Sequence, residues 1–353
     1  MEDAQEMMKE GQVLAVLNPW GRDPDQEFGS GVPDPGAVGH APINYHAYAA
    51  CTGGGFFRDV RKALACSRYI LLVLRRELRV CRKALEELKK EGAVVAVTVK
   101  EAGWHQVASL MKNPRRLRDF FRICELADGA VASTPDLAGI FLGAGMEDAR
   151  VKFIPTPYPV EYEAWNFNRE IKERKGIFIG TREFLVPSRQ HWNAVCLAKR
   201  LQNETGAGVT VYNHDNNRGR RMLEVVPGGV ADWVCIHKKE PYQVYLERMA
   251  EHRIVWQLDH SRVPGQVAGD ALLCRIPCVG GDGAIERIAF PEWNGHGRNV
   301  EELLEIARRL LTDDAFYAES VQKIQDLKAS TLSFQAGAAQ LRIFYGELER
   351  MRR

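Results

Sequence analysis

Short apolar runs alternate with longer amphipathic stretches over the first part of the chain. The apolar runs predict buried strands at 13–17, 69–74, 93–99, 129–132 and 151–154. Helical periodicity between them predicts helices at 56–66, 74–92, 120–127 and 135–143. Strands that alternate with helices in this way are typical of a parallel sheet that is covered on both faces.

A proline-rich segment, 154–159, interrupts this alternation and predicts a linker between two domains. The alternation then resumes, with strands expected at 176–179, 208–212 and 232–236 and helices at 187–204 and 241–251. Ser188 is expected to cap the first of these helices. We therefore expect two tandem α/β domains, 1–157 and 158–332. The last segment, 333–353, predicts a long helix with one apolar face, which could pack back on the N-terminal domain.

The segment 253–290 carries the strongest sign of a ligand site. An apolar strand at 254–258 is followed by a turn at 261–265, a helix at 266–274, a short strand at 277–279 and the glycine loop 280–283. Pro264 suits the opening of the helix, whose free N–H groups and positive dipole end would face the turn. This order predicts a site for a diphosphate, although an ordinary strand, helix and strand unit accounts for the same residues equally well.

Composition places the chain among globular proteins. It has 353 residues, a net charge of +2 and 45% hydrophobic residues, which suits about two domains. No apolar run is long enough to span a membrane, and the N-terminus is acidic and polar. The eight cysteines form no CxxC pair. We therefore expect a cytoplasmic protein with reduced thiols.

Positive charge is concentrated between Arg58 and Arg122, where 17 Lys and Arg stand against seven Asp and Glu. Such asymmetry predicts peripheral contact with an anionic membrane surface. The alternative is a solvated helix face on which Glu77, Glu86 and Glu87 pair with the cations at helical spacing. Aromatic residues are not interleaved with these charges as base stacking would need, so no nucleic-acid partner is expected.

Between Cys124 and Asn294 the chain resembles the large retaining group of GT-B glycosyltransferases called family 4. The segments CELADGAVASTPDLAGIFLGAG and RVKFIPTPY are similar to the end of that family's N-terminal domain, and GIFIGTRE is similar to the first strand of its C-terminal domain. ALLCRIPCVGG aligns with the helix and strand that contain and follow the family's paired glutamates, which places Arg262 at the first glutamate and Asp270 at the second. The resemblance implies two Rossmann-like domains, a nucleotide sugar in the cleft between them, and a C-terminal helix that packs back.

The resemblance also implies a set of donor-binding residues. Arg182 and Arg189 would hold the diphosphate, and Asp270 would accept hydrogen bonds from the ribose hydroxyls. The loop that begins at His237 would contact the base. Further donor contacts are expected from the turn, the helix N-terminus and the glycine loop, at Ser261, Gly265, Gln266, Gly281 and Asp282.

Three residues are the catalytic candidates that the resemblance implies. Lys100 ends a strand at which the family often carries a histidine, and His105 lies a short distance farther along the chain. Arg262 stands where the family has a carboxylate near the transferred sugar. Lys100 or His105 would approach that sugar from the N-terminal domain.

These residues lead to a hypothesis of retaining sugar transfer from a nucleoside diphosphate sugar to a lipid-linked or small-molecule acceptor. Positioned cations and helix N-termini would stabilise the leaving diphosphate in this hypothesis, so neither a metal nor another cofactor is expected. A chelator should then leave the activity intact. Arg262 and Lys100 also motivate an alternative, a catalytically inactive GT-B subunit that binds or scaffolds. A sugar-nucleotide epimerase on the same fold is a third reading.

Overall fold

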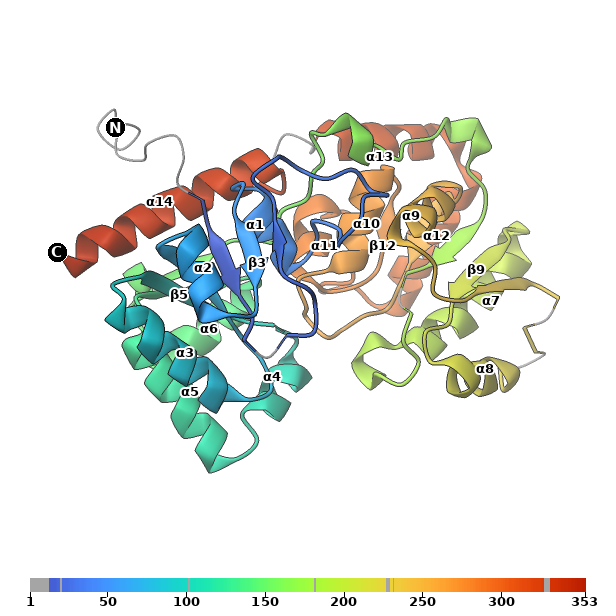
Figure 1. The fold of residues 1–353 in the computed structure, drawn as a ribbon. Helices are drawn as coiled ribbons and strands as arrows, with labels where there is room; N and C mark the ends of the chain where they lie inside the picture. The colour runs from blue at the N-terminus through green and yellow to red at the C-terminus, as the bar shows by residue number, and fades with distance from the viewer. Residues whose placement is uncertain are drawn as a thin grey trace. The chain divides into compact units, whose positions relative to one another are not determined.

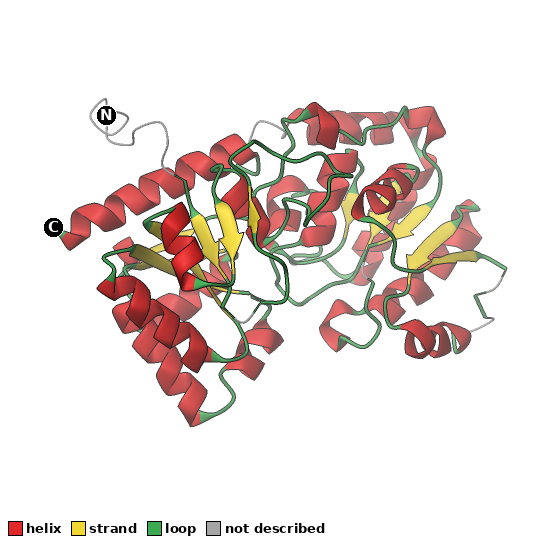
Figure 2. Cartoon of the chain, viewed as in Figure 1, coloured by secondary structure: helices red, strands yellow, loops and turns green. Residues whose placement is uncertain are grey.

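The computed structural model describes residues 13–19, 21–100, 102–180, 182–226, 229–230, 232–326 and 331–353. The chain forms two compact units (Figure 1). Unit 1 comprises Met1–Glu161 and Ala329–Arg353, and unit 2 comprises Tyr162–Lys328. In each unit, helices lie on both sides of a sheet (Figure 2). No helix in the described part of the chain is both long and apolar enough to cross a membrane.

Unit 1 contains a seven-stranded sheet in the order β2-β3-β1-β4-β5-β6-β7. Every pairing is parallel except that of β2 with β3. The strands are β1 (Ala15–Leu17), β2 (Gln26–Glu27), β3 (Gly55–Phe57), β4 (Tyr69–Leu74), β5 (Val94–Val99), β6 (Gly129–Ala132) and β7 (Val151–Phe153). Strands β4 and β5 are buried along their whole length, because helices cover both faces of the sheet.

The helices of unit 1 are α1 (Tyr45–Ala50), α2 (Val60–Cys66), α3 (Leu78–Lys90), α4 (Trp104–Leu110), α5 (Pro114–Leu126), α6 (Pro135–Gly143) and α14 (Phe334–Arg352), with a 3-10 turn at Asp148–Arg150. Alternate residues of β4 enter two different cores. Ile70 and Leu72 belong to one core, whereas Leu71 belongs to the other together with Leu341 and Phe344 of α14. The C-terminal helix therefore completes one face of unit 1.

Unit 2 contains a five-stranded sheet in the order β10-β9-β8-β11-β12, and all pairings are parallel. The strands are β8 (Ile177–Ile179), β9 (Val209–Tyr212), β10 (Val234–His237), β11 (Ile254–Trp256) and β12 (Cys278–Val279). The α-helices are α7 (His191–Thr205), α8 (Asn216–Glu224), α9 (Tyr242–Ala250), α10 (Gln266–Cys274), α11 (Ala284–Ala289), α12 (Val300–Thr312) and α13 (Asp314–Asp326). Three 3-10 turns precede α7, at Glu163–Trp165, Ile171–Glu173 and Pro187–Arg189.

Several predicted helices begin later than their patterns suggested, including the one expected at 74–92, which begins at Leu78. The stretch 56–66 starts as strand β3, which pairs with β1, and the helix begins only after Asp59, whose carboxylate accepts hydrogen bonds from two backbone N–H groups. The stretch 187–204 starts as a 3-10 turn, and α7 begins at His191. The N-cap of α7 is Gln190 in a left-handed conformation, so the prediction that Ser188 caps this helix was wrong.

Candidate functional site

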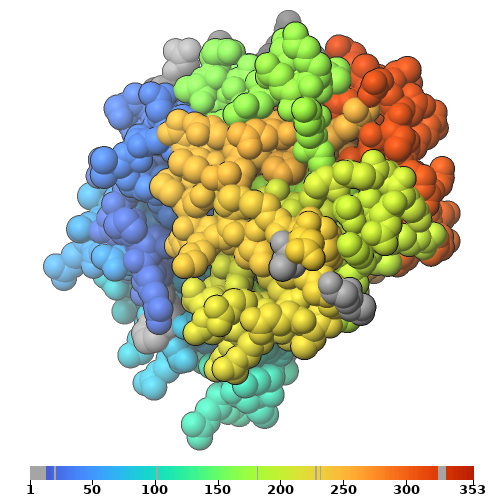
Figure 3. Space-filling model, turned by 90° about the vertical axis from the view of Figure 1, so that its right-hand side faces the viewer, coloured from blue at the N-terminus to red at the C-terminus, as the bar shows by residue number. Residues whose placement is uncertain are grey.

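The carboxyl ends of all five parallel strands of unit 2 meet at one edge of its sheet. In open α/β sheets this edge is where ligands bind, because the loops that follow the strands converge there. Most of the predicted donor-binding residues follow β8, β10, β11 or β12, and the others lie in the first turns of α10. Helices α9 and α10 pack against each other next to these loops. The yellow and orange surface in Figure 3 belongs to this unit.

Arg182 and Asp270 form the polar centre of this edge. The Arg182 guanidinium lies over the ring of Tyr245, 5.0 Å from its centroid. Asp270 is fully buried in α10, and the Tyr242 hydroxyl donates a 2.5 Å hydrogen bond to its Oδ1. Its Oδ2 is buried and accepts no hydrogen bond from the described residues. Burial raises the pKa of Asp270 to about 6, against the opposing effects of the Arg182 charge and the Tyr242 hydrogen bond.

Arg189, the second predicted phosphate ligand, is already engaged by protein carboxylates. Its guanidinium donates to Asp259 and lies 3.6 Å from Glu183. Asp259 also accepts a 2.8 Å hydrogen bond from the backbone N–H of Ser261 and another from its hydroxyl. The Ser261 side chain is therefore turned toward Asp259, where it stabilises the turn after β11.

The glycines at 265, 280 and 281 leave room for atoms of neighbouring protein residues. Gly265 has φ +98°, a conformation that L side chains rarely adopt, and a Cβ there would overlap the Glu286 carboxyl. A Cβ on Gly280 would overlap the Gln257 carbonyl oxygen, and a Cβ on Gly281 would lie 2.8 Å from Gln257 Nε2. The glycine pattern, read from sequence as space for a ligand to approach the backbone, is thus explained by the packing of Gln257 and Glu286.

Glu286 is a site residue that the sequence interpretation missed. It is 2% exposed, and Gln257 Nε2 donates a 2.9 Å hydrogen bond to its Oε1. Its Oε2 accepts no hydrogen bond from the part of the chain that the structure describes. Burial raises the pKa of this carboxyl to about 8, and the negative charge of Asp259 acts in the same direction. The available signal was a carboxylate inside the apolar run AIERIAF, directly after the glycine loop.

Asp282 is surrounded by cations. It accepts a 2.8 Å hydrogen bond from Arg287, and it lies 3.5 Å from Arg262 Nε and 3.2 Å from His296 Nδ1. Arg262 has φ +52°, and its side chain is 40% exposed. The structure therefore directs the predicted catalytic guanidinium toward the glycine loop.

Gln266 is the first residue of α10, whose N-terminus has no side-chain cap among the described residues.

His237, the predicted base contact, ends β10. Its ring stacks on that of Tyr212, with centroids 5.4 Å apart, and burial lowers its pKa. The Tyr212 hydroxyl donates to Glu240, which also accepts a 3.1 Å hydrogen bond from Arg248. The end of β10 thus carries a half-buried imidazole that rests on the buried Tyr212 ring, and the free face of such a ring is suited to stacking against a base.

The catalytic candidates of unit 1 lie on separate elements. Lys100 follows β5 at the carboxyl edge of the sheet, and its ammonium lies over the Tyr45 ring, 5.0 Å from the centroid. His105 is exposed in α4. The sequence interpretation missed His46 in α1, which is fully buried near this edge. Burial, together with the charges of His40 and Lys100, lowers the pKa of His46 to about 2.

A surface hollow of about 460 Å³ lies at the opposite, amino edge of the unit 2 sheet. Its lining includes residues that precede β8, β9 and β10, such as Gly176, Gly208 and Asp232. The arginines and carboxylates described above do not line it. Because parallel sheets bind ligands at the carboxyl edge, the chemistry of unit 2 belongs there rather than in this hollow.

Comparison with known proteins identifies the fold. Neither a protein-family model nor a curated protein sequence matches the chain. Among solved structures, sucrose-phosphate synthase from Thermosynechococcus elongatus is similar over 97% of this chain and 99% of its own, with TM-score 0.62 and 15% identity. HepE from Anabaena in complex with UDP and glucose is similar over 80% and 79%, with TM-score 0.59 and 14% identity.

A third similar structure is a UDP-forming α,α-trehalose-phosphate synthase from Burkholderia xenovorans, which is matched over 83% of this chain and 77% of its own with TM-score 0.58 and 12% identity. At such identities the likeness defines the fold. The chain has the two-domain α/β fold of GT-B glycosyltransferases, and the predicted fold class is confirmed.

Proposed function

We propose that the protein is a retaining glycosyltransferase that takes a sugar from a nucleoside diphosphate sugar without a metal in the donor site. The observation that carries the proposal is that the half-buried Arg182 and the buried Asp270, whose Oδ2 receives no hydrogen bond from the described residues, act electrostatically on each other at the carboxyl edge of unit 2. The similar HepE structures, which contain UDP, UDP with glucose, or UDP-glucose, support this donor class.

In this proposal the donor is held by charge and hydrogen bonding. Arg182 neutralises a phosphate, and Asp270 accepts a ribose hydroxyl through Oδ2 while Tyr242 holds Oδ1. The N-terminus of α10 offers the positive end of its helix dipole to the diphosphate. These groups stabilise the negative charge that develops on the leaving diphosphate as the glycosidic bond to the donor breaks.

The proposal also assigns roles to the predicted catalytic residues. Arg262 and its partner Asp282 would contact the sugar, because both lie at the turn and glycine loop beside α10. Lys100 or His105 of unit 1 would approach it from the acceptor side. The acceptor is proposed to be a lipid-linked or small molecule bound by unit 1.

Binding of UDP by the purified chain, measured by calorimetry with GDP, ADP and dTDP in parallel, tests the donor site. Arg182→Ala should weaken nucleotide affinity by about 10-fold or more, because a charge-assisted hydrogen bond contributes about 1.5–3 kcal/mol. Arg182→Lys separates loss of charge from loss of packing against Tyr245. The matched control is Arg220→Ala in α8, whose side chain is 68% exposed. Equal affinity in the Arg182→Ala variant and the control would refute the assignment.

Metal independence has its own test. The proposal gives the neutralisation of the phosphate to the Arg182 guanidinium and not to a metal ion. EDTA should therefore leave the affinity for UDP unchanged. A large fall in affinity, reversed by Mg²⁺ or Mn²⁺, would contradict this part of the proposal.

A second candidate is a subunit that binds the nucleotide without turnover. The pairing of Arg262 with Asp282 favours it, since a guanidinium lies where the resembling family has an acceptor of hydrogen bonds. Incubation of the protein with UDP-glucose distinguishes the two. Release of UDP, by transfer or by hydrolysis, supports the enzyme, whereas tight binding without release supports the binding subunit.

A further inference from the structure

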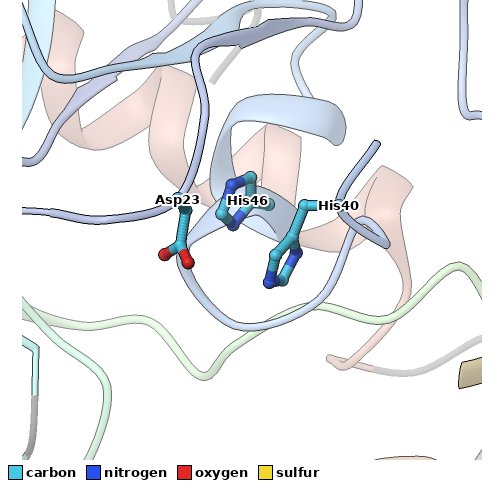
Figure 4. A group of neighbouring side chains, drawn as sticks. All are labelled: Asp23, His40 and His46. Carbon is cyan, nitrogen blue, oxygen red and sulfur yellow. The ribbon is translucent and has the colours of Figure 1, made fainter. Parts of the chain in front are cut away.

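Three side chains with metal-ligating atoms meet in unit 1. Asp23 and His40 lie in the long loop that follows β1, and His46 lies in α1. One ligand atom from each lies within 4.8 Å of the others, and Figure 4 shows the three side chains side by side. The loop spans more than twenty residues with β2 as its regular element, so this convergence is a product of folding rather than of short sequence spacing.

His46 is the buried member of the group. Its ring lies between the rings of His40 and Phe56, each with a centroid distance of 3.9 Å. Neither ring nitrogen of His46 has a hydrogen-bond partner among the described residues. Buried polar atoms without a partner are rare and destabilising, and a ligand is one established explanation for them. The packing therefore holds an imidazole with an unused lone pair inside the group.

His40 is held in a defined orientation. Its Nδ1 lies 2.7 Å from the carbonyl oxygen of Ala41, and because a carbonyl can only accept, Nδ1 donates. In the neutral ring Nε2 then carries the lone pair. Gln26 fixes the backbone of His40 from both sides, since its Oε1 accepts from the backbone N–H at 2.8 Å and its Nε2 donates to the carbonyl at 3.2 Å. A ring N–H bonded to a backbone carbonyl is the usual support of a metal-binding histidine.

We propose that Asp23, His40 and His46 bind one divalent transition-metal ion of the Zn²⁺ type. Two imidazoles and one carboxylate suit such ions, whereas Mg²⁺ and Ca²⁺ prefer sites made of oxygen ligands alone. Three protein ligands leave a fourth position for water or for a group of the acceptor. The ion ties the loop after β1 to α1 and satisfies one nitrogen of His46.

The stacked rings give this site a specific conformational consequence. The two imidazole planes are inclined by only 8°, so the lone pairs of the two rings lie in separate, nearly parallel planes. Both can point at one ion at about 2.0–2.1 Å only if the rings tilt apart. His46 is fully buried between its neighbours and His40 is half-buried, so the tilt falls on the His40 ring while Gln26 keeps the His40 backbone in place. Metal binding thus tilts the His40 ring.

The site is separate in its residues from the proposed donor site. Its three ligands belong to unit 1, whereas Arg182 and Asp270 belong to unit 2. The ion therefore has no part in neutralising the donor phosphates in our proposal. Removing it should lower the thermal stability of unit 1 and leave the affinity for UDP as it is, so failure of one proposal does not imply failure of the other.

The test uses the full chain, stripped with EDTA and dialysed. Titration with Zn²⁺ by calorimetry should give one ion per chain, and Co²⁺ should give the visible absorption of a nitrogen-ligated site. Asp23→Asn and His40→Gln should each weaken Zn²⁺ binding by at least about tenfold, since each removes one of three ligands. Asp34→Asn is the matched control, because Asp34 is exposed in the same loop.

Two results would overturn the proposal. One is the absence of stoichiometric binding of Zn²⁺ or Co²⁺ by the parent chain. The other is binding that both Asp23→Asn and His40→Gln retain, which would place the ion elsewhere, for example on the exposed thiol of Cys235. Loss in both variants with retention in Asp34→Asn supports the site, and circular dichroism of each variant confirms that the chain remains folded.

Discussion

Replacing Glu286 by glutamine should change how the stability of the protein depends on pH. Burial raises the pKa of this carboxyl from its ordinary value of 4.5 to about 8 in the folded protein. Each unit of pKa difference between folded and unfolded states corresponds to about 1.4 kcal/mol. The pKa difference of about 3.5 therefore means that binding of this proton stabilises the folded state by roughly 5 kcal/mol.

The sign follows from which state holds the proton. Between about pH 5 and pH 8 the folded protein keeps Glu286 protonated, whereas the unfolded chain has released this proton. The stabilising contribution is thus complete below pH 4.5 and is lost as the pH rises through about 8. In this window the free energy of unfolding falls by about 1.4 kcal/mol for each pH unit. Glutamine does not ionise, so Glu286→Gln should gain roughly 4 kcal/mol over the parent between pH 5 and pH 8.

Urea unfolding of the parent and of Glu286→Gln at several pH values measures this difference. Glutamine keeps the shape of the side chain and can still accept the hydrogen bond from Gln257. Glu170→Gln is the matched control, because Glu170 is an exposed glutamate of the same unit. If the free energies of unfolding of the parent and of Glu286→Gln depend on pH in the same way, the pKa of Glu286 is not raised in the folded protein and the reasoning fails.

Two further predictions concern binding. Asp270 has a pKa of about 6, so UDP affinity should rise by about tenfold from pH 5 to pH 7 as its carboxylate becomes available to the ribose. Asp270→Asn should remove this increment in calorimetric titrations, and an unchanged pH profile in that variant would count against the ribose contact. The basic surface of α3 should favour anionic over neutral vesicles in sedimentation assays, and reversing the charge of the exposed Arg79 and Lys83 should abolish the preference. Equal sedimentation with both vesicle types would remove the membrane hypothesis.

Ion pairs within unit 1 reduce the number of cations that can attract an anionic vesicle. Arg82 is bonded to Glu86 at 2.5 Å and to Asp119 at 2.9 Å, and Arg116 lies 3.5 Å from Glu77. Lys89 is bonded to Asp128. Part of the local positive charge is therefore paired, and the exposed cations of α3 are those that could contact a headgroup.

Elements with a strong local signal could be predicted closely from sequence. The strand at 69–74 is a continuous apolar run, as expected for a strand buried on both faces, and the structure has it at Tyr69–Leu74. The helices predicted at 135–143 and 266–274 coincide with α6 and α10. Both are preceded by residues that mark a helix start, namely Thr134, which caps α6, and Gly265, the N-cap of α10.

Features that depend on distant parts of the chain could not be predicted in this way. Phe56 and Phe57 fit a helical pattern locally, but their pairing with β1 makes them a strand. Arg189 was interpreted as a free phosphate ligand because its partner Asp259 lies on another strand end. His46 has no local sequence signal, since its environment is made by the rings of His40 and Phe56, which come from other segments.

Two carboxyl groups with unlike proton affinities lie at the carboxyl edge of unit 2, where the donor site is proposed. Asp270 and Glu286 are both buried, and each has one oxygen without a described partner. With pKa values of about 6 and about 8, Asp270 is mainly ionised at pH 7 and Glu286 mainly protonated. Asp270 can therefore accept from a sugar hydroxyl while Glu286 donates to an oxygen. Above pH 8 Glu286 loses its proton and becomes a second acceptor, so selectivity among ligands should change with pH even where Arg182 remains charged.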